Sequence, residues 1–367
     1  MLKTSLKLLQ KIEDNGFQAY IVGGFVRDYY LKKRSIDVDI CTNATPYDLS
    51  KIFKEALLPN EQYGSVSLIY KRIRFEITTW RKEIRYEDRK PIEIEYINDL
   101  IMDLKRRDFT INTLCMNSKG EIIDELDGIH DIENKIIRII EDPIIKLKED
   151  PLRILRAIRF ATILDFAIEP ALKEAIKKQG YILKKLSYTR KKEELTRIFA
   201  SPNVQYGIKL MQELGLAEYL ELQNLDKIKI VDDVLGMWAQ VDVMDLYPFN
   251  KTEQEIINKV NKVLTLSILN SHTLYKYGLY ITSIAANIKG IPKYKVVSIY
   301  DGLKIKSRNE IKITAQQLCE LLRRPPGRWI TKIYNELETK IINNELENDE
   351  QTLKNYIINM DKIHTLE

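Results

Sequence analysis

The chain has 367 residues, of which 44% are hydrophobic and 30% charged, so it can build a sizeable core and more than one compact unit. Its formal net charge of +5 is compatible with a polyanionic partner but does not by itself indicate one. Its three cysteines lie far apart without a C-x-x-C pair, which argues against a disulfide framework or a zinc site. No apolar run is long enough to cross a membrane, and we expect a cytoplasmic protein without a membrane partner.

The N-terminal part begins with a predicted helix, a strand and a glycine pair. Apolar residues at helical spacing predict an amphipathic helix that ends near Asn15-Gly16, and the run Ala19 to Val22 predicts a strand. Gly23 and Gly24 follow this strand and open a helix predicted near Phe25 to Lys32. Glycines at such a place let backbone N–H groups approach a phosphate, and a helix N-terminus favours anions.

The next predicted strand, Ile36 to Ile40, carries two carboxylates on one face. Its alternation puts the apolar side chains on one side, and Asp37 and Asp39 on the other. Two adjacent carboxylates are costly to bury unless a cation lies between them, and Mg²⁺ prefers carboxylate oxygens together with substrate phosphates. Each motif alone is common, but together with the glycine pair they predict metal-assisted nucleotidyl transfer. In this reaction a hydroxyl attacks the α-phosphate in line and pyrophosphate leaves.

Two further strands supply a candidate third carboxylate. Thr45 and Pro46 predict the start of a helix that runs to about Ala56, and 66–70 and 73–79 are predicted as paired strands. In the second strand Glu76 lies on the polar face, close to the expected position of the first two carboxylates. The equally supported alternative is that Glu76 pairs with a lysine or arginine across the sheet.

The stretch from Trp80 to Pro91 is charged and lacks an apolar period, which predicts a mobile loop. Alternation returns over 92–97, and short strands are predicted at 121–124 and 136–140. The first part of the chain is therefore predicted to be α+β, with a mixed or mostly antiparallel sheet.

From about Glu141 onward, helical patterns dominate and strand signals become sparse. The predicted helices cover 150–162, 170–178, 191–200 and 204–214. We therefore expect an α+β head at 1–140, a helical neck at 141–200 and a helical body and tail at 201–367.

Two arginine motifs add candidates for nucleotide binding. Arg106 and Arg107 suit a triphosphate because guanidinium forks pair with phosphate oxygens, although a bare pair is more often surface charge. Asp150 is predicted as an N-cap with Pro151 at the first helical position, and Arg153 follows one turn later. An acid beside an arginine presents an acceptor next to a donor, which complements the base edge shared by cytosine and adenine. Guanine and uracil have the reversed pattern and would leave buried groups unpaired.

Five motifs in this order closely resemble those of the class II tRNA nucleotidyltransferases, or CCA-adding enzymes, with bacterial poly(A) polymerases as near relatives. The motifs are GGFVRD followed by IDVDICTNATP, then RRDFTIN, DELDGIHD, EDPLRILRAIRFA and LSYTRKKEEL. With an RPPGR segment near the end, the resemblance covers nearly the whole chain. The chain departs from the family pattern at Met102, where glutamate is usual, and at Tyr188-Thr189, where Pro-Glu is usual.

The resemblance implies a role for each matching position. Mg²⁺ would be held by Asp37 and Asp39. The nucleotide would be bound by Gly24, Arg27 and Arg107 at the triphosphate, by Asp150 and Arg153 at the base, and by Arg156 and Arg159 in support of the nucleotide or the primer end. The helical body and tail would bind tRNA mainly through its backbone and shape.

The stretch from Arg81 to Pro91 also resembles the family's flexible loop, which relatives that add only the two cytidines have lost. We therefore predict that the chain adds C, C and A to the 3′ end of tRNA from CTP and ATP, with Mg²⁺ and without a DNA partner. The alternatives are an A-adding enzyme and a poly(A) polymerase. A non-catalytic RNA-binding relative is disfavoured because Asp37 and Asp39 are both retained.

Overall fold

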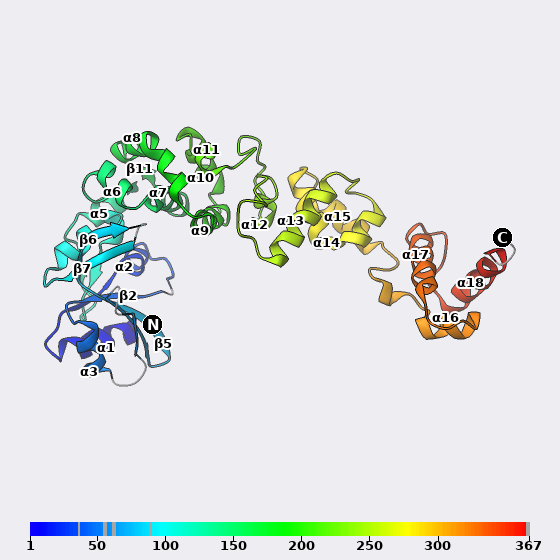
Figure 1. The fold of residues 1–367 in the computed structure, drawn as a ribbon, viewed down its shortest axis with the longest axis horizontal. Coiled ribbons are helices and arrows are strands. Elements are labelled where there is room, and N and C mark those ends of the chain that lie inside the picture. The colour runs from blue at the N-terminus through cyan, green and yellow to red at the C-terminus, as the bar shows by residue number, and fades with distance from the viewer. Residues whose placement is uncertain (36, 54–56, 61–63, 88–89, 365–367) are drawn as a thin grey trace. The chain divides into compact units, whose positions relative to one another are not determined.

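The chain folds into two compact units, Met1–Leu222 and Gln223–Glu367, in a computed structural model (Figure 1). The structure describes residues 1–35, 37–53, 57–60, 64–87 and 90–364. Ile36 and Ala56, which bound predicted elements, and Asp88 and Arg89, inside the predicted loop, lie outside these residues. The finer division into head, neck, body and tail stays a prediction.

The N-terminal part of the first unit contains a mixed seven-stranded sheet in the order β3-β4-β5-β2-β1-β8-β9. All neighbouring strands are antiparallel except β2 and β5, which are parallel. This sheet confirms the predicted α+β class. The strands are β1 (Ala19–Val22), β2 (Asp39–Thr42), β3 (Leu57–Asn60), β4 (Ser65–Tyr70), β5 (Ile73–Thr79), β8 (Cys115–Met116) and β9 (Ile122–Ile123).

The acidic strand starts later than predicted. β2 begins at Asp39, because its partner β1 ends at Val22, opposite Asp39, where the chain turns at Gly23. Asp37 therefore lies just before the strand rather than within it. The predicted alternation still holds, because Val38 is buried while Asp37 and Asp39 are exposed.

Short helices surround this sheet. α1 ends before Gly16, which has a φ of 87°, as the sequence predicted. α3 starts with a capping box between Thr45 and Asp48 and contacts α1 (Figure 1). It ends at Ile52, before the predicted end. The helices are α1 (Leu2–Glu13), α2 (Gly24–Tyr30), α3 (Pro46–Ile52), α4 (Leu100–Lys105) and α5 (Gly128–Glu133), with a 3-10 turn at Thr110–Asn112.

The prediction of a loop from Trp80 to Pro91 is wrong. β6 (Arg81–Glu87) and β7 (Lys90–Tyr96) pair as an antiparallel hairpin (Figure 1). A two-stranded hairpin lacks a buried face over much of its length, so it needs no apolar alternation. Its base is held by charged groups instead, because the Asp103 carboxylate accepts a hydrogen bond from the backbone N–H of Arg81.

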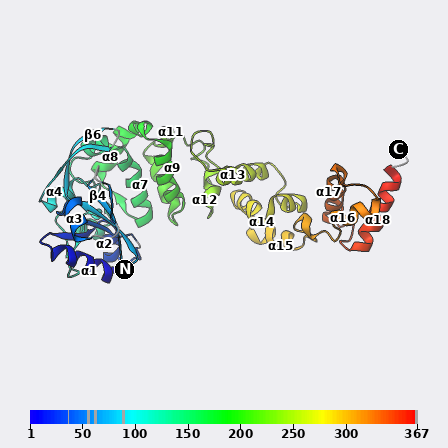
Figure 2. The ribbon, with the colours of Figure 1, turned by 60° about the horizontal axis from the view of Figure 1, so that its bottom comes forward.

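A helical layer completes the first unit, and α7 packs against α9 (Figure 2) and against α10 within it. The helices are α6 (Pro143–Glu149), α7 (Leu152–Leu164), α8 (Pro170–Gln179), α9 (Tyr188–Phe199), α10 (Val204–Glu213) and α11 (Ala217–Leu220). β11 (Ala167–Ile168) pairs in parallel with β10 (Ile136–Ile137), so the two parts of the unit share a small sheet. α7 starts at Leu152 with Pro151 as its N-cap, which corrects the predicted cap at Asp150. The Asp150 carboxylate nevertheless accepts a hydrogen bond from the Leu152 backbone N–H, at 2.9 Å.

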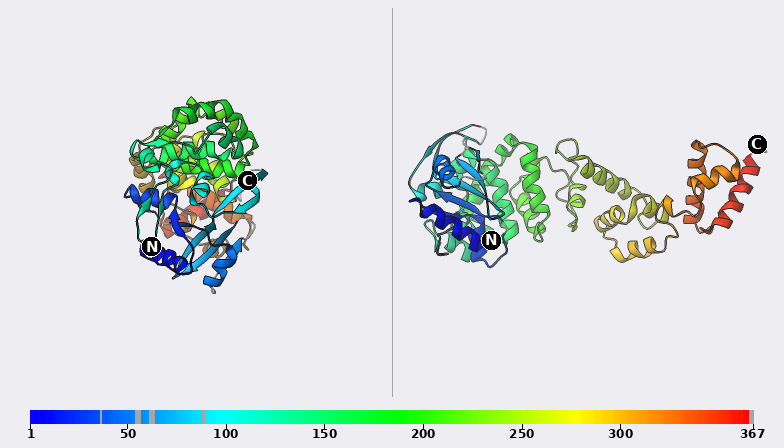
Figure 3. Two further views of the ribbon diagram at one scale, coloured as in Figure 1. Left: turned by 90° about the vertical axis from the view of Figure 1, so that its left-hand side faces the viewer. Right: turned by 90° about the horizontal axis from the view of Figure 1, so that it is seen from below.

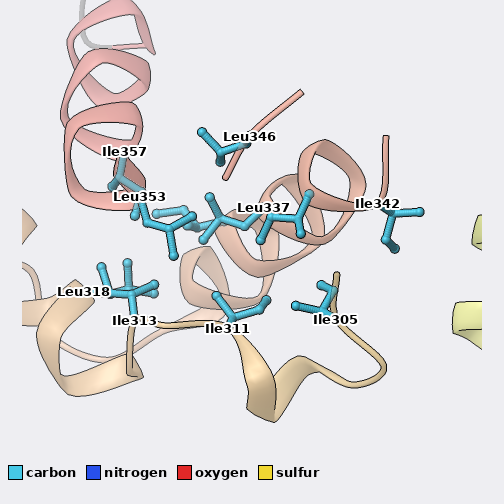
Figure 4. Close-up of a cluster of buried hydrophobic side chains, with 11 residues drawn as sticks. Ile305, Ile311, Ile313, Leu318, Leu337, Ile342, Leu346, Leu353 and Ile357 are labelled. Carbon is cyan, nitrogen blue, oxygen red and sulfur yellow. The ribbon is translucent and has the colours of Figure 1, made fainter. Parts of the chain in front are cut away.

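The second unit contains helices and connecting loops, and no strand among the residues that the structure describes. α16, α17 and α18 gather around an apolar cluster in which Leu318, Leu337 and Leu353 are fully buried (Figures 3 and 4). The helices are α12 (Val234–Trp238), α13 (Lys251–Leu264), α14 (Ser271–Ile288), α15 (Lys293–Asp301), α16 (Ala315–Leu322), α17 (Arg328–Ile342) and α18 (Glu350–His364). Within the described ranges of the whole chain, no helix has the length and apolar character needed to cross a membrane.

Candidate active site

A pocket of about 420 Å³ in the first unit brings most of the predicted site residues together. It is lined by the glycine turn and α2, the start of β2, the segment after α4 and the first turns of α7. The lining residues are Gly23, Gly24, Arg27, Asp39, Arg107, Asp108, Asn112, Asp150, Leu152, Arg153, Arg156 and Phe160.

The glycine turn forms one wall of the pocket. Gly23 has a φ of 81°, which L side chains rarely adopt, so a glycine is required there. A Cβ atom at Gly24 would lie 3.6 Å from the Arg27 guanidinium, and both residues line the pocket. Arg27 itself is buried and donates a 2.6 Å hydrogen bond to the Asn112 side-chain oxygen. It also donates to the Asp28 carboxylate, so its guanidinium is held in one place.

Asp39, at the start of β2, lines the pocket, and its side chain is exposed there. The protein atoms around the carboxylate reduce its hydration and raise the pKa of Asp39. Arg107 opposes that rise, while Glu76 and Asp37 add to it through like-charge repulsion. Glu76 pairs directly with Asp39 across the parallel strands β5 and β2, as the prediction of neighbouring strands required.

This donor set fits a hard divalent cation. The carboxylates of Asp37, Asp39 and Glu76 repel one another, and a bound cation would relieve this repulsion. Within the described ranges, no three acidic, histidine or cysteine side chains form a complete metal site. Two carboxylates with substrate phosphates would meet the usual requirement of Mg²⁺. The role of Glu76 as a third ligand stays a prediction.

The two adjacent arginines have different surroundings. Arg106 donates to the buried Asp103 carboxylate at 2.8 Å and lies 3.5 Å from Glu83 of the hairpin. Arg107 lines the pocket and contacts Asp103 at 3.4 Å, and its Nε has no hydrogen-bond partner among the described residues. Burial works to lower the pKa of Arg107, but Asp103 and other nearby groups outweigh it and raise the pKa. Arg107 therefore stays charged and has an unused donor.

The start of α7 forms the opposite wall of the pocket. The Arg153 guanidinium is buried and donates to the backbone oxygens of Lys146, at 2.9 Å, and Arg106, at 3.1 Å. It also donates to the Glu149 carboxylate at 3.0 Å. These bonds fix Arg153 beside Asp150 in the pocket lining, where the predicted acceptor and donor stand together.

Arg156 and Arg159 differ in position. Arg156 lines the pocket and its Nε donates to the Asp108 carboxylate at 2.6 Å. Burial alone would raise the pKa of Asp108, but Arg156 and Asn112 outweigh it and lower the pKa. Arg159 is buried outside the pocket lining and pairs with Glu194 of α9 at 3.2 Å. Burial lowers the pKa of Arg159 to about 10, despite the opposing effect of Glu194.

The pocket thus gathers most of the predicted residues and adds others that the sequence reasoning missed. Asp37, Glu76 and Arg159 were predicted but do not line it. Asp108, Asn112 and Phe160 line it but were not predicted. Asp108 and Asn112 stand four residues apart in RRDFTIN, a spacing that places both on one side of a turn. Phe160 carries no such signal, because an apolar residue in an amphipathic helix is expected to join the core.

Replacing Asp39 by asparagine is expected to raise the melting temperature at neutral pH in buffer without divalent ions. The raised pKa means that the folded state disfavours the charged carboxylate. The charged carboxylate therefore lowers the free energy of unfolding. This destabilisation is complete above the folded pKa and absent below the unfolded pKa of about 3.9. The stabilisation should therefore fade as the pH falls through the raised folded pKa and should be absent below about 4. Thermal melts of both proteins at several pH values test this, and an equal or lower melting temperature of the variant at pH 7 would contradict it.

Fold and site together define a nucleotidyltransferase. Residues 19–138 match the family model described as the Poly A polymerase head domain. Residues 165–225 match the probable RNA and SrmB-binding site of polymerase A, and 242–357 match the putative tRNA nucleotidyltransferase domain 2.

The relatives identify the family within this class. A CCA-adding enzyme of Ligilactobacillus salivarius is 33% identical, over 96% of this chain and 95% of the relative. The fold is similar to that of the Bacillus stearothermophilus CCA-adding enzyme in complex with CTP, with a TM-score of 0.86 at 24% identity, over 99% of this chain and 98% of the other. It is also similar to the Thermotoga maritima CCA-adding enzyme complexed with tRNA, with a TM-score of 0.72 at 22% identity, over 97% and 94% of the two chains. The chain belongs to the family of CCA-adding enzymes.

Proposed function

We propose that this chain is a tRNA nucleotidyltransferase that adds C, C and A to the 3′ end of tRNA, using CTP and ATP and releasing pyrophosphate. Family membership over nearly the full length supports this activity. The observation that carries it is one pocket in which Asp39 and Arg107 face the pair formed by Asp150 and Arg153. Neither an A-adding enzyme nor a poly(A) polymerase is favoured by the relatives. The presence of both Asp37 and Asp39 argues against a non-catalytic RNA-binding protein.

The two walls of the pocket bind different parts of the nucleotide. The triphosphate lies against the glycine turn, where Gly24, Arg27 and Arg107 offer backbone space and positive charge. The base lies against α7, where the Asp150 carboxylate accepts from the exocyclic amine of C or A and Arg153 donates to the adjacent ring nitrogen. A G or U base would set donor against donor and acceptor against acceptor, and each unpaired buried group costs about 1–3 kcal/mol.

Asp37 and Asp39 would hold Mg²⁺, and family members generally use a divalent metal. When bound, the ion would activate the attacking oxygen and neutralise charge on the leaving group. The protein's own part is to hold the nucleotide and to orient the α-phosphate toward the tRNA 3′-hydroxyl. Arg27 and Arg107 fix the phosphates, and the Asp150–Arg153 pair fixes the base at the other end.

Each of the three predicted regions would have its own function. The head at 1–140 carries the catalytic carboxylates, the neck at 141–200 reads the base with support from Arg156 and Arg159, and the body and tail at 201–367 bind tRNA. The acceptor arm would be bound through backbone and shape, since every tRNA must be accepted. The enzyme would act in the cytoplasm, without a membrane or DNA partner.

Purified protein should extend a tRNA transcript that ends at the discriminator base by three residues when CTP, ATP and Mg²⁺ are supplied. With CTP alone it should add two residues, and a transcript ending in -CC should receive one A. Gel electrophoresis of the products at single-nucleotide resolution measures each step. Extension only from -CC would establish an A-adding enzyme, and long A tails a poly(A) polymerase. No extension of any transcript would contradict the proposal.

A further inference from the structure

The Phe160 side chain lies among three arginines. The centroid of its ring is 5.2 Å from the guanidinium carbon of Arg27, 5.4 Å from that of Arg156 and 4.4 Å from that of Arg159. The ring is half-buried and lines the pocket. A guanidinium within about 6 Å of an aromatic ring is attracted by the negative potential of the ring face. A single neutral side chain therefore interacts with three positive charges.

These contacts link the two walls of the pocket. Arg27 belongs to α2 on the triphosphate side, whereas Arg156 and Arg159 belong to α7 on the base side. Phe109, which follows the Arg106-Arg107 pair, packs edge-on against Phe160 with the ring centroids 5.7 Å apart. Phe160 is thus a member of α7 that contacts both parts of the nucleotide site.

A chain of hydrogen bonds also joins Arg27 to Arg156. Arg27 donates to Asn112, Asn112 donates to Asp108 at 3.0 Å, and Asp108 accepts from Arg156. Together with the ring of Phe160, these bonds form a closed circuit. The polar route holds the edge of each guanidinium, because Arg27 also donates to Asp28 and both Arg27 and Arg156 bond through their nitrogen atoms. The aromatic ring adds a surface that restrains the planes of Arg27 and Arg156.

We propose that Phe160 is a positioning residue that holds Arg27 and Arg156 in the geometry required for nucleotide binding. This inference rests on the proposed function. It requires a ring with a π face, because an aliphatic side chain of similar size would fill the space without attracting the guanidiniums. It also places the effect of Phe160 on the nucleotide rather than on the tRNA.

The experiment compares Phe160→Leu with Phe160→Tyr in steady-state nucleotide addition. We expect Phe160→Leu to raise KM for both CTP and ATP about tenfold, which corresponds to about 1.4 kcal/mol. Phe160→Tyr should stay within about threefold of the original protein, because its ring keeps the π face. KM for tRNA should change in neither variant. Rescue by tyrosine and the separation of the two KM values would not follow from a purely structural role.

Phe166 provides a matched control, because it follows the same helix and is buried in the apolar core. Phe166→Leu should lower the melting temperature without changing KM for nucleotides. If Phe160→Leu does not fold, Phe160→Met supplies a second non-aromatic variant of similar size. Unchanged nucleotide KM values in the non-aromatic variant, or equal losses with leucine and tyrosine, would overturn the inference. Failure of the unaltered protein to extend tRNA would instead overturn the proposed function.

Discussion

Replacing Asp39 by asparagine is expected to slow the addition of both C and A by about a thousandfold, or about 4 kcal/mol of transition-state stabilisation. Asp39 is the member of the predicted pair that lines the pocket, and it directly neighbours Glu76. The amide keeps the size of the side chain but removes the charge that a divalent ion requires. Single-turnover rates with transcripts ending at the discriminator base, and with transcripts ending in -CC, measure the two steps.

The same variant separates a catalytic role from a structural one. Its affinity for tRNA should be unchanged, because the proposed tRNA-binding surface lies in 201–367. Mg²⁺ should raise the melting temperature of the original protein by binding its folded form, and this rise should be absent in Asp39→Asn. Asp14→Asn, at an exposed carboxylate after α1, should keep full activity. Near-normal rates in Asp39→Asn would refute the assignment of Asp39 as a metal ligand.

Local sequence signals predicted those parts of the fold that depend on neighbouring residues. The strand 73–79 alternates as predicted, with Phe75 and Ile77 buried, and the helix after Thr45 has the predicted cap. Pairing between distant segments was less predictable. In the hairpin, β6 pairs with β7 and its first residue bonds to Asp103. No local sequence pattern reveals either contact. The start of β2 depends on where β1 ends, which is again a property of the partner.

The candidate site shows the same division. Asp39 could be found from the paired carboxylates of a predicted strand, Arg107 from the adjacent arginines, and Arg153 from an acid and an arginine at a predicted helix start. The sequence could not show that Arg107 lines the pocket while Arg106 faces Asp103 and the hairpin. Phe160 has no signal at all, because its importance comes from the arginines that the fold brings around it.

The fixed position of Arg153 supports the base-reading role that we propose for it. Its bonds to the Lys146 and Arg106 backbone oxygens and to Glu149 determine the direction of its guanidinium before a nucleotide arrives. A donor that cannot turn away meets the N–H of G or U with an unfavourable contact. The same donor meets the bare ring nitrogen of C or A with a hydrogen bond. In the proposed role of Arg153, selection would therefore arise from the rigidity of its guanidinium as much as from its charge.

Arg153→Ala is therefore expected to reduce the preference for CTP over UTP, and for ATP over GTP, by about tenfold to a hundredfold. Most of this change should come from improved use of UTP and GTP, because the opposing donor is gone while Arg27 and Arg107 still hold the triphosphate. Values of kcat/KM for the four nucleotides measure the effect. Arg190→Ala, at an exposed arginine of α9 paired with Glu193, is the matched control and should keep the original preference. A variant that loses activity with all four nucleotides in equal proportion would show that Arg153 supports the pocket without reading the base.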